Sequence, residues 1–319
     1  MTKYMIKRLV TSFVTLFVLS VVIFIIAHMA EGDPAVIILG ETASPEQLSA
    51  LRESLGLDKP LVMQYIDWIS RAVRGDLGVS YFNKNSVTQN ISERLSPSLV
   101  LASVSQVVAI LLAIPMGVLA ARHKGRRLDC ALSVTAILGM SVPSFLLSLV
   151  MMLFFGVTLK WLPVTGFRTI SEHGLAVWLR YSIMPVLALG LSHAGLITRM
   201  TRSSMIEALK TDYIKTAKAK GVAERVILFK HALRNSFIPV LTAIGQSFGG
   251  LLAGTAIIES MFNIPGVGQL IVTSITRRDY PVIQGVVLTV SVVWIIINLL
   301  VDFLYGVIDP RIRVAERAA

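Results

Sequence analysis

Apolar residues along this chain of 319 residues gather in blocks of about 20, and polar segments separate the blocks. A block of that length is sufficient to cross the hydrocarbon core of a bilayer as a helix. The expected spans are 9–29, 99–121, 132–159, 183–200, 237–258 and 282–308. The pattern therefore predicts an all-α integral membrane protein with six transmembrane helices.

Composition supports a membrane protein, because 54% of the residues are hydrophobic and 15% are charged, whereas soluble domains carry about 25% charged residues. Basic residues precede the first span, as they do in a secretory signal. The apolar run of that span is about 20 residues, longer than the roughly 7–15 of a signal. The residues 27–30 that follow are also a poor cleavage site. We expect an uncleaved anchor.

The charges predict the orientation. With the amino terminus inside, the expected cytoplasmic segments hold 19 of the 30 Lys and Arg residues and 7 of the 19 acids. The net charge is then +12 inside and −1 outside, as the positive-inside rule requires. Both termini are expected in the cytoplasm. The basic residues serve as topology signals, some of them in contact with anionic lipid headgroups, and imply no nucleic-acid partner.

The outer segment between the first two spans, residues 31–97, is the largest polar piece. A helix is expected over 45–55, with Ser44 as its cap and Gly56 at its end. A second helix is expected over 61–74. One of its faces carries Leu61, Tyr65, Trp68 and Ile69. Turns are expected at 32–34 and 75–78. The segment is either a small cap packed on the spans or a docking surface for a soluble extracytoplasmic partner.

Catalytic and metal-binding motifs are missing from the sequence. No Gly-Lys dipeptide occurs, so there is no Walker A loop, and there is no His-Glu-x-x-His zinc motif. Cys130 is the single cysteine, which excludes an internal disulfide and a paired-cysteine metal site. We expect it to be a small buried residue near the cytoplasmic end of the third span.

Ser192 and His193 come nearest to a hydrolase constellation. Neighbours on a helix point about 100° apart, so the two side chains do not face each other. We expect His193 to be a hydrogen-bonded intramembrane residue or part of a polar pathway. An intramembrane enzyme built on this pair is a minor alternative.

Polar and small residues inside the spans suggest a solute pathway. In the fifth span, glycines four apart, at 245, 249, 250 and 254, either allow tight helix packing or leave backbone open to a polar solute. Candidate pathway residues are Ser141, Pro143, Ser144, His193, Gln246, Ser247, Gly249, Gly250 and Glu259. Several acids near the midplane, as a proton-coupled pump needs, are lacking. Asp302 is expected to pair with Arg311 or Arg313.

The polar segment 207–235 is expected to form two amphipathic helices bent at Gly221, which suits the left-handed position at a helix end. The apolar faces hold Ile206, Leu209, Tyr213 and Ala217 before the bend, and Val222, Val226, Phe229 and Leu233 after it. The opposite faces carry Lys210, Lys215, Lys218, Lys220, Arg225 and Lys230. Such helices either lie on the membrane surface or present a knuckle to a groove on another protein.

The run Asp212–Gly221, followed after nine intervening residues by His231–Asn235, resembles the EAA loop of binding-protein-dependent ABC importer permeases. It is similar to the variant in the dipeptide, oligopeptide and nickel permeases. Lys215, Thr216 and Ala217 stand where the general pattern has Glu-Ala-Ala, so only the alanine and Gly221 persist. Further family-like pieces are Gly32–Ala35, Leu55–Pro60, Gly75–Gly78, Met200–Met205, Arg278–Val282, Val301–Tyr305 and Asp309–Arg311.

The resemblance implies a type I ABC importer permease fold in the bacterial cytoplasmic (inner) membrane. It implies a second homologous permease subunit, two cytoplasmic ATPase subunits and an extracytoplasmic solute-binding protein as partners. The subunit is then not an enzyme and binds no cofactor, while ATP and Mg are used by the ATPases. The expected segments are a cytoplasmic N-terminus and anchor at 1–30, an insertion at 31–97, a core at 98–310 with its coupling loop at 201–235, and a tail at 311–319.

The resemblance also implies which residues couple the permease to the ATPases. They are Asp212, Tyr213, Thr216, Ala217, Lys218, Ala219, Lys220, Gly221, Val222, Glu224, Arg225, His231, Arg234 and Asn235. Segment 257–266 is expected to be the outer end of span five and a reentrant piece, with turns at Gly266 and Gly268. The family transports short peptides, glutathione, nickel chelates and some sugars, and short peptides are the favoured solute. An autonomous channel or ion-coupled carrier is the alternative.

Overall fold

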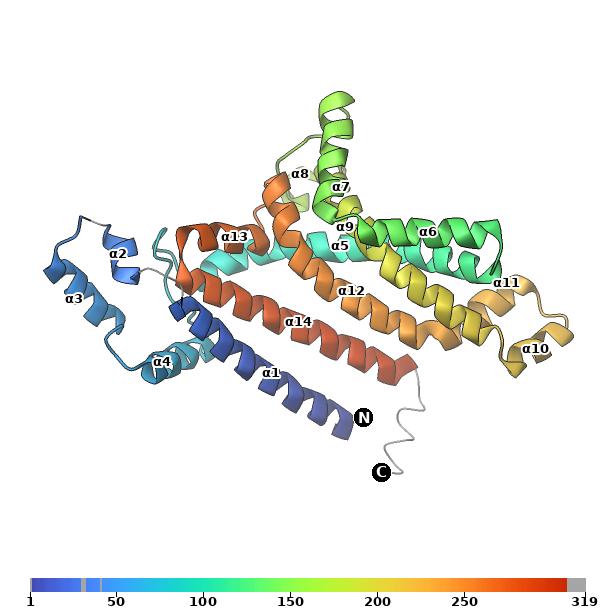
Figure 1. Ribbon diagram of the computed structural model, residues 1–319, viewed down its shortest axis with the longest axis horizontal. Helices are drawn as coiled ribbons and strands as arrows, with labels where there is room; N and C mark the ends of the chain where they lie inside the picture. The colour runs from blue at the N-terminus through green and yellow to red at the C-terminus, as the bar shows by residue number, and fades with distance from the viewer. Residues whose placement is uncertain (1, 30–32, 41, 309–319) are drawn as a thin grey trace. The chain divides into compact units, whose positions relative to one another are not determined.

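The computed structural model describes residues 2–29, 33–40 and 42–308, and these residues form helices joined by turns (Figure 1). The first half contains α1 (Thr2–Met29), α2 (Pro34–Leu39), α3 (Pro45–Leu55), α4 (Leu61–Val73), α5 (Val87–Arg122), α6 (Arg127–Ser141), α7 (Ser144–Met151) and the π-helix η1 (Met152–Thr158). The second contains α8 (Ile170–His173), α9 (Leu175–Ala208), α10 (Asp212–Ala219), α11 (Glu224–Val226), the π-helix η2 (Ile227–Ala232), α12 (Leu233–Phe262), α13 (Val267–Arg277) and α14 (Tyr280–Ile308).

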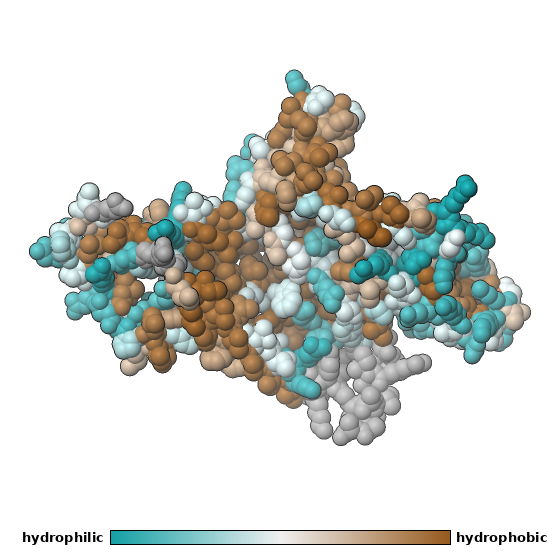
Figure 2. Space-filling view, in the orientation of Figure 1, coloured by the Kyte–Doolittle hydropathy of each residue, from teal (hydrophilic) through white to brown (hydrophobic). Residues whose placement is uncertain are grey.

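The number of membrane spans agrees with the prediction. Five helical segments are long and apolar enough to cross a bilayer alone: 6–29, 87–122, 175–208, 224–262 and 280–305. A sixth span results if the pair formed by α6 with α7 and η1, which is bent by 96°, is counted as one. The third span predicted over 132–159 is thus helical, with a sharp bend that its predicted range did not include. Figure 2 shows the apolar surface that α6 and α7 expose and the polar surface around α10.

The bend between α6 and α7 follows from Pro143. Proline has no backbone N–H, and it drives the residue before it out of the helical region. Val142 accordingly has φ −82° and ψ 117°, so α6 ends at Ser141 and α7 begins at Ser144.

The chain divides into two compact units, whose boundaries fall inside or next to helices. We call residues 97–264 and 297–308 the core unit, and residues 2–96 and 265–296 the cap unit. Gly32 lies outside the described residues. The predicted cytoplasmic tail at 311–319, which contains Arg311 and Arg313, lies outside them as well. Asp302, for which an arginine partner was predicted there, is buried in the core unit.

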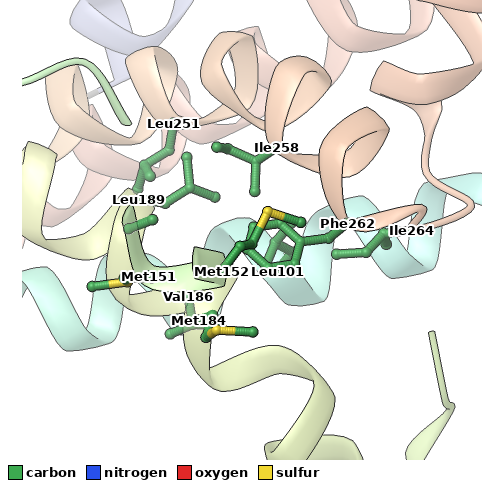
Figure 3. Close-up of a cluster of buried hydrophobic side chains, with 11 residues drawn as sticks. Leu101, Met151, Met152, Met184, Val186, Leu189, Leu251, Ile258, Phe262 and Ile264 are labelled. Carbon is green, nitrogen blue, oxygen red and sulfur yellow. The ribbon is translucent and has the colours of Figure 1, made fainter. Parts of the chain in front are cut away.

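In the core unit, α9 packs against both α6 and α12. Glycines allow close approach to α9: a Cβ added at Gly117 of α5 would lie 2.6 Å from Thr201 Cβ, and one at Gly250 of α12 would lie 2.8 Å from His193 Cε1. A cluster of buried side chains fills the space between α5, α7, α9 and α12. Figure 3 shows Leu101, Met151, Met152, Met184, Val186, Leu189, Leu251, Ile258, Phe262 and Ile264 in it.

In the cap unit, both predicted helices of the outer segment are confirmed. Ser44 caps α3 through a reciprocal pair with Gln47, with bonds of 3.3 and 3.1 Å, and Gly56 ends the helix at φ +69°. Trp68 of α4 is buried and packs on Phe24 of α1, with ring centroids 6.0 Å apart. The turns at Gly75 and Gly78 have φ values of +86° and +90°.

Several boundaries differ from the prediction. Helix α5 begins at Val87, twelve residues before the expected span, because Val87 and Ile91 are buried against Val267 and Val286 and so extend the helix. Gly268 lies inside α13 rather than in a turn, and Gly266 caps that helix. A turn was expected at 32–34. Residues 34–39 instead form α2, with Asp33 as its cap.

The candidate coupling site

The polar segment after α9 folds into one short helix and a left-handed turn. Thr211, in extended backbone, precedes α10, and Asp212 in the first turn suits the positive helix end. At the other end, the Gly221 N–H donates to Lys218 O at 3.0 Å and the Val222 N–H donates to Ala217 O at 3.2 Å. This pair of bonds is a Schellman motif with glycine in the left-handed position, at φ +74°. The predicted bend at Gly221 is confirmed.

A helix follows the bend, as predicted, but it does not end with the polar segment. Residues from Glu224 run through α11 and η2 directly into α12, as one helical segment 39 residues long. Before the bend, Ile206 belongs to α9, and the chain breaks at 209–211 before α10 begins. Gly221 therefore joins a short exposed helix to the start of the fifth span.

One buried side chain anchors α10 to the core unit. Ile214 has no exposed surface and packs in a cluster with side chains of α5, α9 and η2. We call this the cytoplasmic cluster. Its buried members are Val118, Ala121, Met205, Ala208, Ile214, Ile227, Leu228 and Ala232. The helix is thus fixed along one face, and the opposite face is free to meet a partner.

The predicted apolar faces were partly wrong. Ala217, Val222 and Leu233 pack against the cytoplasmic cluster, as expected, and so do Ile206 and Leu209. Tyr213, Val226 and Phe229 are instead 41%, 39% and 54% exposed. The chain break at 209–211 changes which residues of α10 face the core unit. A π-helical turn holds more residues than an α-helical one, so η2 turns Ile227 and Leu228 inward. A single 3.6-residue period could not reveal either shift.

Two ion pairs hold the acids on either side of the bend. The guanidinium of Arg122, at the end of α5, binds Glu224 through two bonds, Nε to Oε1 at 2.9 Å and Nη2 to Oε2 at 2.8 Å. Within α10, Lys215 Nζ lies 2.8 Å from Asp212 Oδ1. The sequence reasoning missed Arg122, which lies 102 residues before its partner.

The cations of the segment are left exposed. Lys218, Lys220, Arg225 and Lys230 are exposed and have no ion-pair partner among residues 2–29, 33–40 and 42–308. Of the remaining predicted coupling residues, Thr216, Ala219, Arg234 and Asn235 are exposed and His231 is half-buried. The surface around Gly221 is therefore basic, because its two acids are neutralised within the chain.

A second bidentate pair braces the same end of the core unit. Arg202 of α9 binds Asp129 of α6, Nε to Oδ1 at 2.6 Å and Nη2 to Oδ2 at 2.9 Å. Asp129 also accepts from the Gly125 N–H at 2.9 Å. Asp129 therefore faces inward, and its neighbour Cys130 is exposed, which corrects the expectation of a buried thiol.

The structure spreads the candidate pathway residues over different environments. Ser141, Pro143, Gln246 and Gly250 are exposed, and Ser144, His193 and Gly249 are half-buried. Ser247 is buried and donates to Gln106 Oε1 at 3.1 Å. Glu259 has no exposed surface and accepts from Ser98 Oγ at 2.6 Å. A role for any of them in solute passage stays a prediction.

The polar groups do not form a hydrolase site. Ser192 Oγ donates to Ala188 O at 2.9 Å, so its proton is directed to the backbone. Across the described part of the chain, no group of three His, Cys, Asp or Glu side chains could hold a metal ion.

Known proteins match the chain over nearly its full length. Residues 113–314 match the family described as the binding-protein-dependent transport system inner membrane component, and residues 1–102 match the N-terminal model of such membrane components. The probable peptide ABC transporter permease y4tP of Sinorhizobium fredii is 40% identical, over 97% of this chain and 99% of that protein. The glutathione transport system permease GsiC of Escherichia coli is 42% identical, over 98% and 99%.

The fold also matches a solved transporter. The inward-facing MetNI methionine ABC transporter superposes with a TM-score of 0.56 and 17% identity, over 69% of this chain and 96% of the matched chain. That likeness supports the type I importer permease fold. In this family ATP is hydrolysed by separate subunits, and a binding protein delivers the solute. The chain therefore belongs to the inner membrane components of binding-protein-dependent transport systems, as a multi-pass permease subunit of an ATP-driven importer.

Proposed function

We propose that this subunit forms half of the translocation pathway for short peptides or a related small solute such as glutathione. Two relatives at 40% and 42% identity, named for peptide and glutathione transport, support this solute class. The other half is a second homologous permease. Two cytoplasmic ATPase subunits bind below the pair, and an extracytoplasmic binding protein docks above it. The ATPases use ATP and Mg, and this subunit binds no cofactor.

The coupling role belongs to α10 and the turn at Gly221, which seat in a groove of one ATPase. The observation that carries this proposal is the one-sided burial of α10: Ile214 fixes the helix to the core unit, while its remaining surface is exposed and basic. A helix held in that way moves as one body with the cytoplasmic ends of α5, α9 and α12. Closure of the ATPases then shifts packed helices between two arrangements.

Site-directed cross-linking tests the coupling proposal. Cys130 is the single cysteine and is exposed, so Cys130→Ser gives a background without thiols. Ala219→Cys, on exposed α10, is expected to cross-link to an ATPase subunit in the intact transporter, and added ATP is expected to change the yield. Ala50→Cys, an equally exposed alanine on α3, is the matched control and is expected to give no such product. Cross-linking from position 50 but not 219 would contradict the proposal.

The solute is tested by uptake into proteoliposomes that contain the whole transporter and its binding protein. ATP-dependent accumulation of dipeptides or of glutathione is expected. Uptake by the permease alone, without ATPases, would instead support a channel or an ion-coupled carrier.

A further inference from the structure

The cap unit contains a cavity of about 750 Å³. Its walls come from the outer end of α1, from α3 and α4, from the loop at 76–84 and from the start of α14. The volume lies within the roughly 300–1,000 Å³ that small-molecule sites occupy in proteins. Phe24, Trp68 and Leu77 supply apolar wall, and most of the other lining side chains are polar or charged.

One wall of the cavity holds a hydrogen-bond donor with no acceptor. The Trp68 side chain is buried, and its Nε1–H has no partner among the described residues. Its ring is fixed between Phe24 and Tyr65, with centroid distances of 6.0 and 6.1 Å. The Nε1 atom itself is buried, so an occupant of the cavity does not reach its N–H. Trp68 therefore contributes the apolar face of its ring to the wall.

A tyrosine adds a second donor. Burial, together with the nearby Asp279 carboxylate, raises the pKa of Tyr81 to about 12. The phenol therefore stays protonated at neutral pH. The backbone of Tyr81 is held in place, since its N–H donates to Asp279 Oδ1 at 3.1 Å and Ser80 Oγ donates to Asp279 Oδ2 at 2.5 Å.

The charges around the cavity are balanced in sign. Arg71 and Lys84 supply cations, Glu53 and Asp76 supply carboxylates, and none of the four has an ion-pair partner within the described ranges. The remaining charged lining residues, Lys59 and Asp67, form an ion pair with each other, with Nζ 2.7 Å from Oδ2. An occupant with one charge would meet both attraction and repulsion here, whereas a group that carries both signs would satisfy both halves.

Lys84 is held toward this site by a braced turn. It adopts φ +58°, a left-handed conformation that is strained for a residue other than glycine. The turn is closed by the Ser80 N–H, which donates to Asn85 O at 3.0 Å, and by Asn83 Nδ2, which donates to Asn90 Oδ1 at 3.0 Å. The surrounding loop therefore fixes the backbone of Lys84 at the cavity wall, and its side chain is exposed.

We propose that this cavity binds a small zwitterionic group, with Lys84 and Arg71 on its anionic half and Glu53 and Asp76 on its ammonium half. Phe24 and His28 lie in the last turns of the first span, at the outer membrane–water interface in the orientation that the charges predict. Two zwitterions reach that level: a dissolved short peptide and the headgroup of phosphatidylethanolamine. The cap site is independent of the coupling role, and only its peptide arm rests on the proposed function.

Binding to the intact transporter, without its binding protein, tests the cap site. The transporter is placed in nanodiscs of phosphatidylglycerol, which supply no zwitterion, and radiolabelled alanylalanine is added in equilibrium dialysis. Saturable binding is expected. Lys84→Gly is expected to weaken it about tenfold, as the loss of one charge-assisted hydrogen bond would. Trp68→Phe, which keeps an aromatic ring and removes an N–H that the cavity does not reach, is expected to leave binding nearly unchanged.

Matched controls come from the core unit. Lys160 has a similar left-handed backbone, at φ +55°, and Trp161 next to it is 63% exposed. Lys160→Gly and Trp161→Phe are expected to leave binding unchanged. Both Lys84→Gly and Lys160→Gly relieve strain, so a difference between them reports the cavity and not the backbone.

A second membrane composition identifies the source of the zwitterion. If the peptide binds equally in phosphatidylethanolamine nanodiscs, the solute is the occupant. If it is displaced there, and native mass spectrometry finds phosphatidylethanolamine retained by the wild type and lost by Lys84→Gly, the headgroup is the occupant. The proposal is overturned if neither ligand is retained, or if Lys84→Gly and Lys160→Gly behave alike. Normal ATP-driven uptake in that case would leave the transport function standing.

Discussion

The bend at Gly221 and the bend at Pro143 are made by different backbone chemistry. Gly221 ends α10 in the left-handed region, and a Cβ added there would meet no atom within 4 Å. Pro143 instead removes a backbone N–H and separates α6 from α7 by 96°. The first bend therefore depends on backbone conformation and on what fixes its flanks. The second depends on a missing hydrogen bond inside a span. Different substitutions should therefore disturb the two bends: an added side chain at Gly221, and a restored backbone N–H at Pro143.

Removing the anchor of the Gly221 bend should have the largest effect. Ile214→Ala leaves a cavity in the cytoplasmic cluster, and such changes typically destabilise by about 2–5 kcal/mol. We expect ATP hydrolysis to continue while uptake falls to a small fraction, measured together in proteoliposomes. Tyr213→Ala, at the exposed neighbour, is the control and should cost little stability. Equal losses of stability in both variants would show that α10 is not anchored through Ile214. Uptake is compared with the wild type only for Ile214→Ala, because Tyr213 is itself a predicted coupling residue.

Restoring the missing N–H should change the Pro143 bend. In Pro143→Ala the backbone can donate again to the residue four positions earlier, and a proline inside a helix disfavours it by about 3 kcal/mol. Spin labels at exposed Ile137 and Leu149, in the Cys130→Ser background, report the angle. We expect their backbone separation to increase toward the roughly 18 Å of twelve residues in a straight helix. An unchanged distance would assign the bend to packing on α9 instead.

Adding a side chain at the first bend should uncouple the transporter and leave it folded. Gly221→Val forces a branched residue into the left-handed region at about 1–2 kcal/mol. Membrane insertion should persist, while ATP hydrolysis no longer drives uptake. Gly56 ends α3 in the same left-handed region, at φ +69°, and only atoms of the flexible Lys59 side chain lie near an added Cβ. Gly56→Val therefore imposes a similar strain outside α10 and should transport normally. Normal uptake by inserted Gly221→Val would refute the coupling role of the turn.

Exchanging the charges of the Arg122–Glu224 pair should have the smallest effect. The two side chains are 39% and 59% exposed, and exposed pairs contribute about 0.2–1 kcal/mol. Arg122→Glu should lower the amount of solute that is taken up for each ATP hydrolysed by about twofold to fivefold. Adding Glu224→Arg should restore most of it. If the exchange fails to restore coupling while Arg122→Glu impairs it, Arg122 acts through another partner.

Local signals in the sequence predicted the local structure well. Ser44 and Gly56 bound α3 as expected, and Gly221 takes the left-handed backbone that its place after a helix required. Pro143 marked the third span, although proline chemistry alone does not fix how far a helix turns. Those features depend on a few neighbouring residues, so they could be predicted from single-residue propensities.

Features that depend on distant residues could not be predicted in this way. The partner of Glu224 is Arg122, and the partner of Asp129 is Arg202, 73 residues away. The inward turn of Ile214 and Ile227 arises from a helix break and a π-helical segment, which shift the phase of the apolar pattern. The open donor of Trp68 becomes visible only when α1 and α4 are packed together.

The continuous segment from Glu224 to Phe262 has a mechanical consequence. At about 1.5 Å per residue, its 39 residues extend over nearly 60 Å. A rod of that length amplifies rotation: a tilt of about 10° about its inner end displaces the outer end by roughly 10 Å. Glu259 lies one turn from that outer end and bonds to Ser98 of α5. A rotation of a few degrees at the end next to Gly221 thus displaces Glu259 by several ångströms.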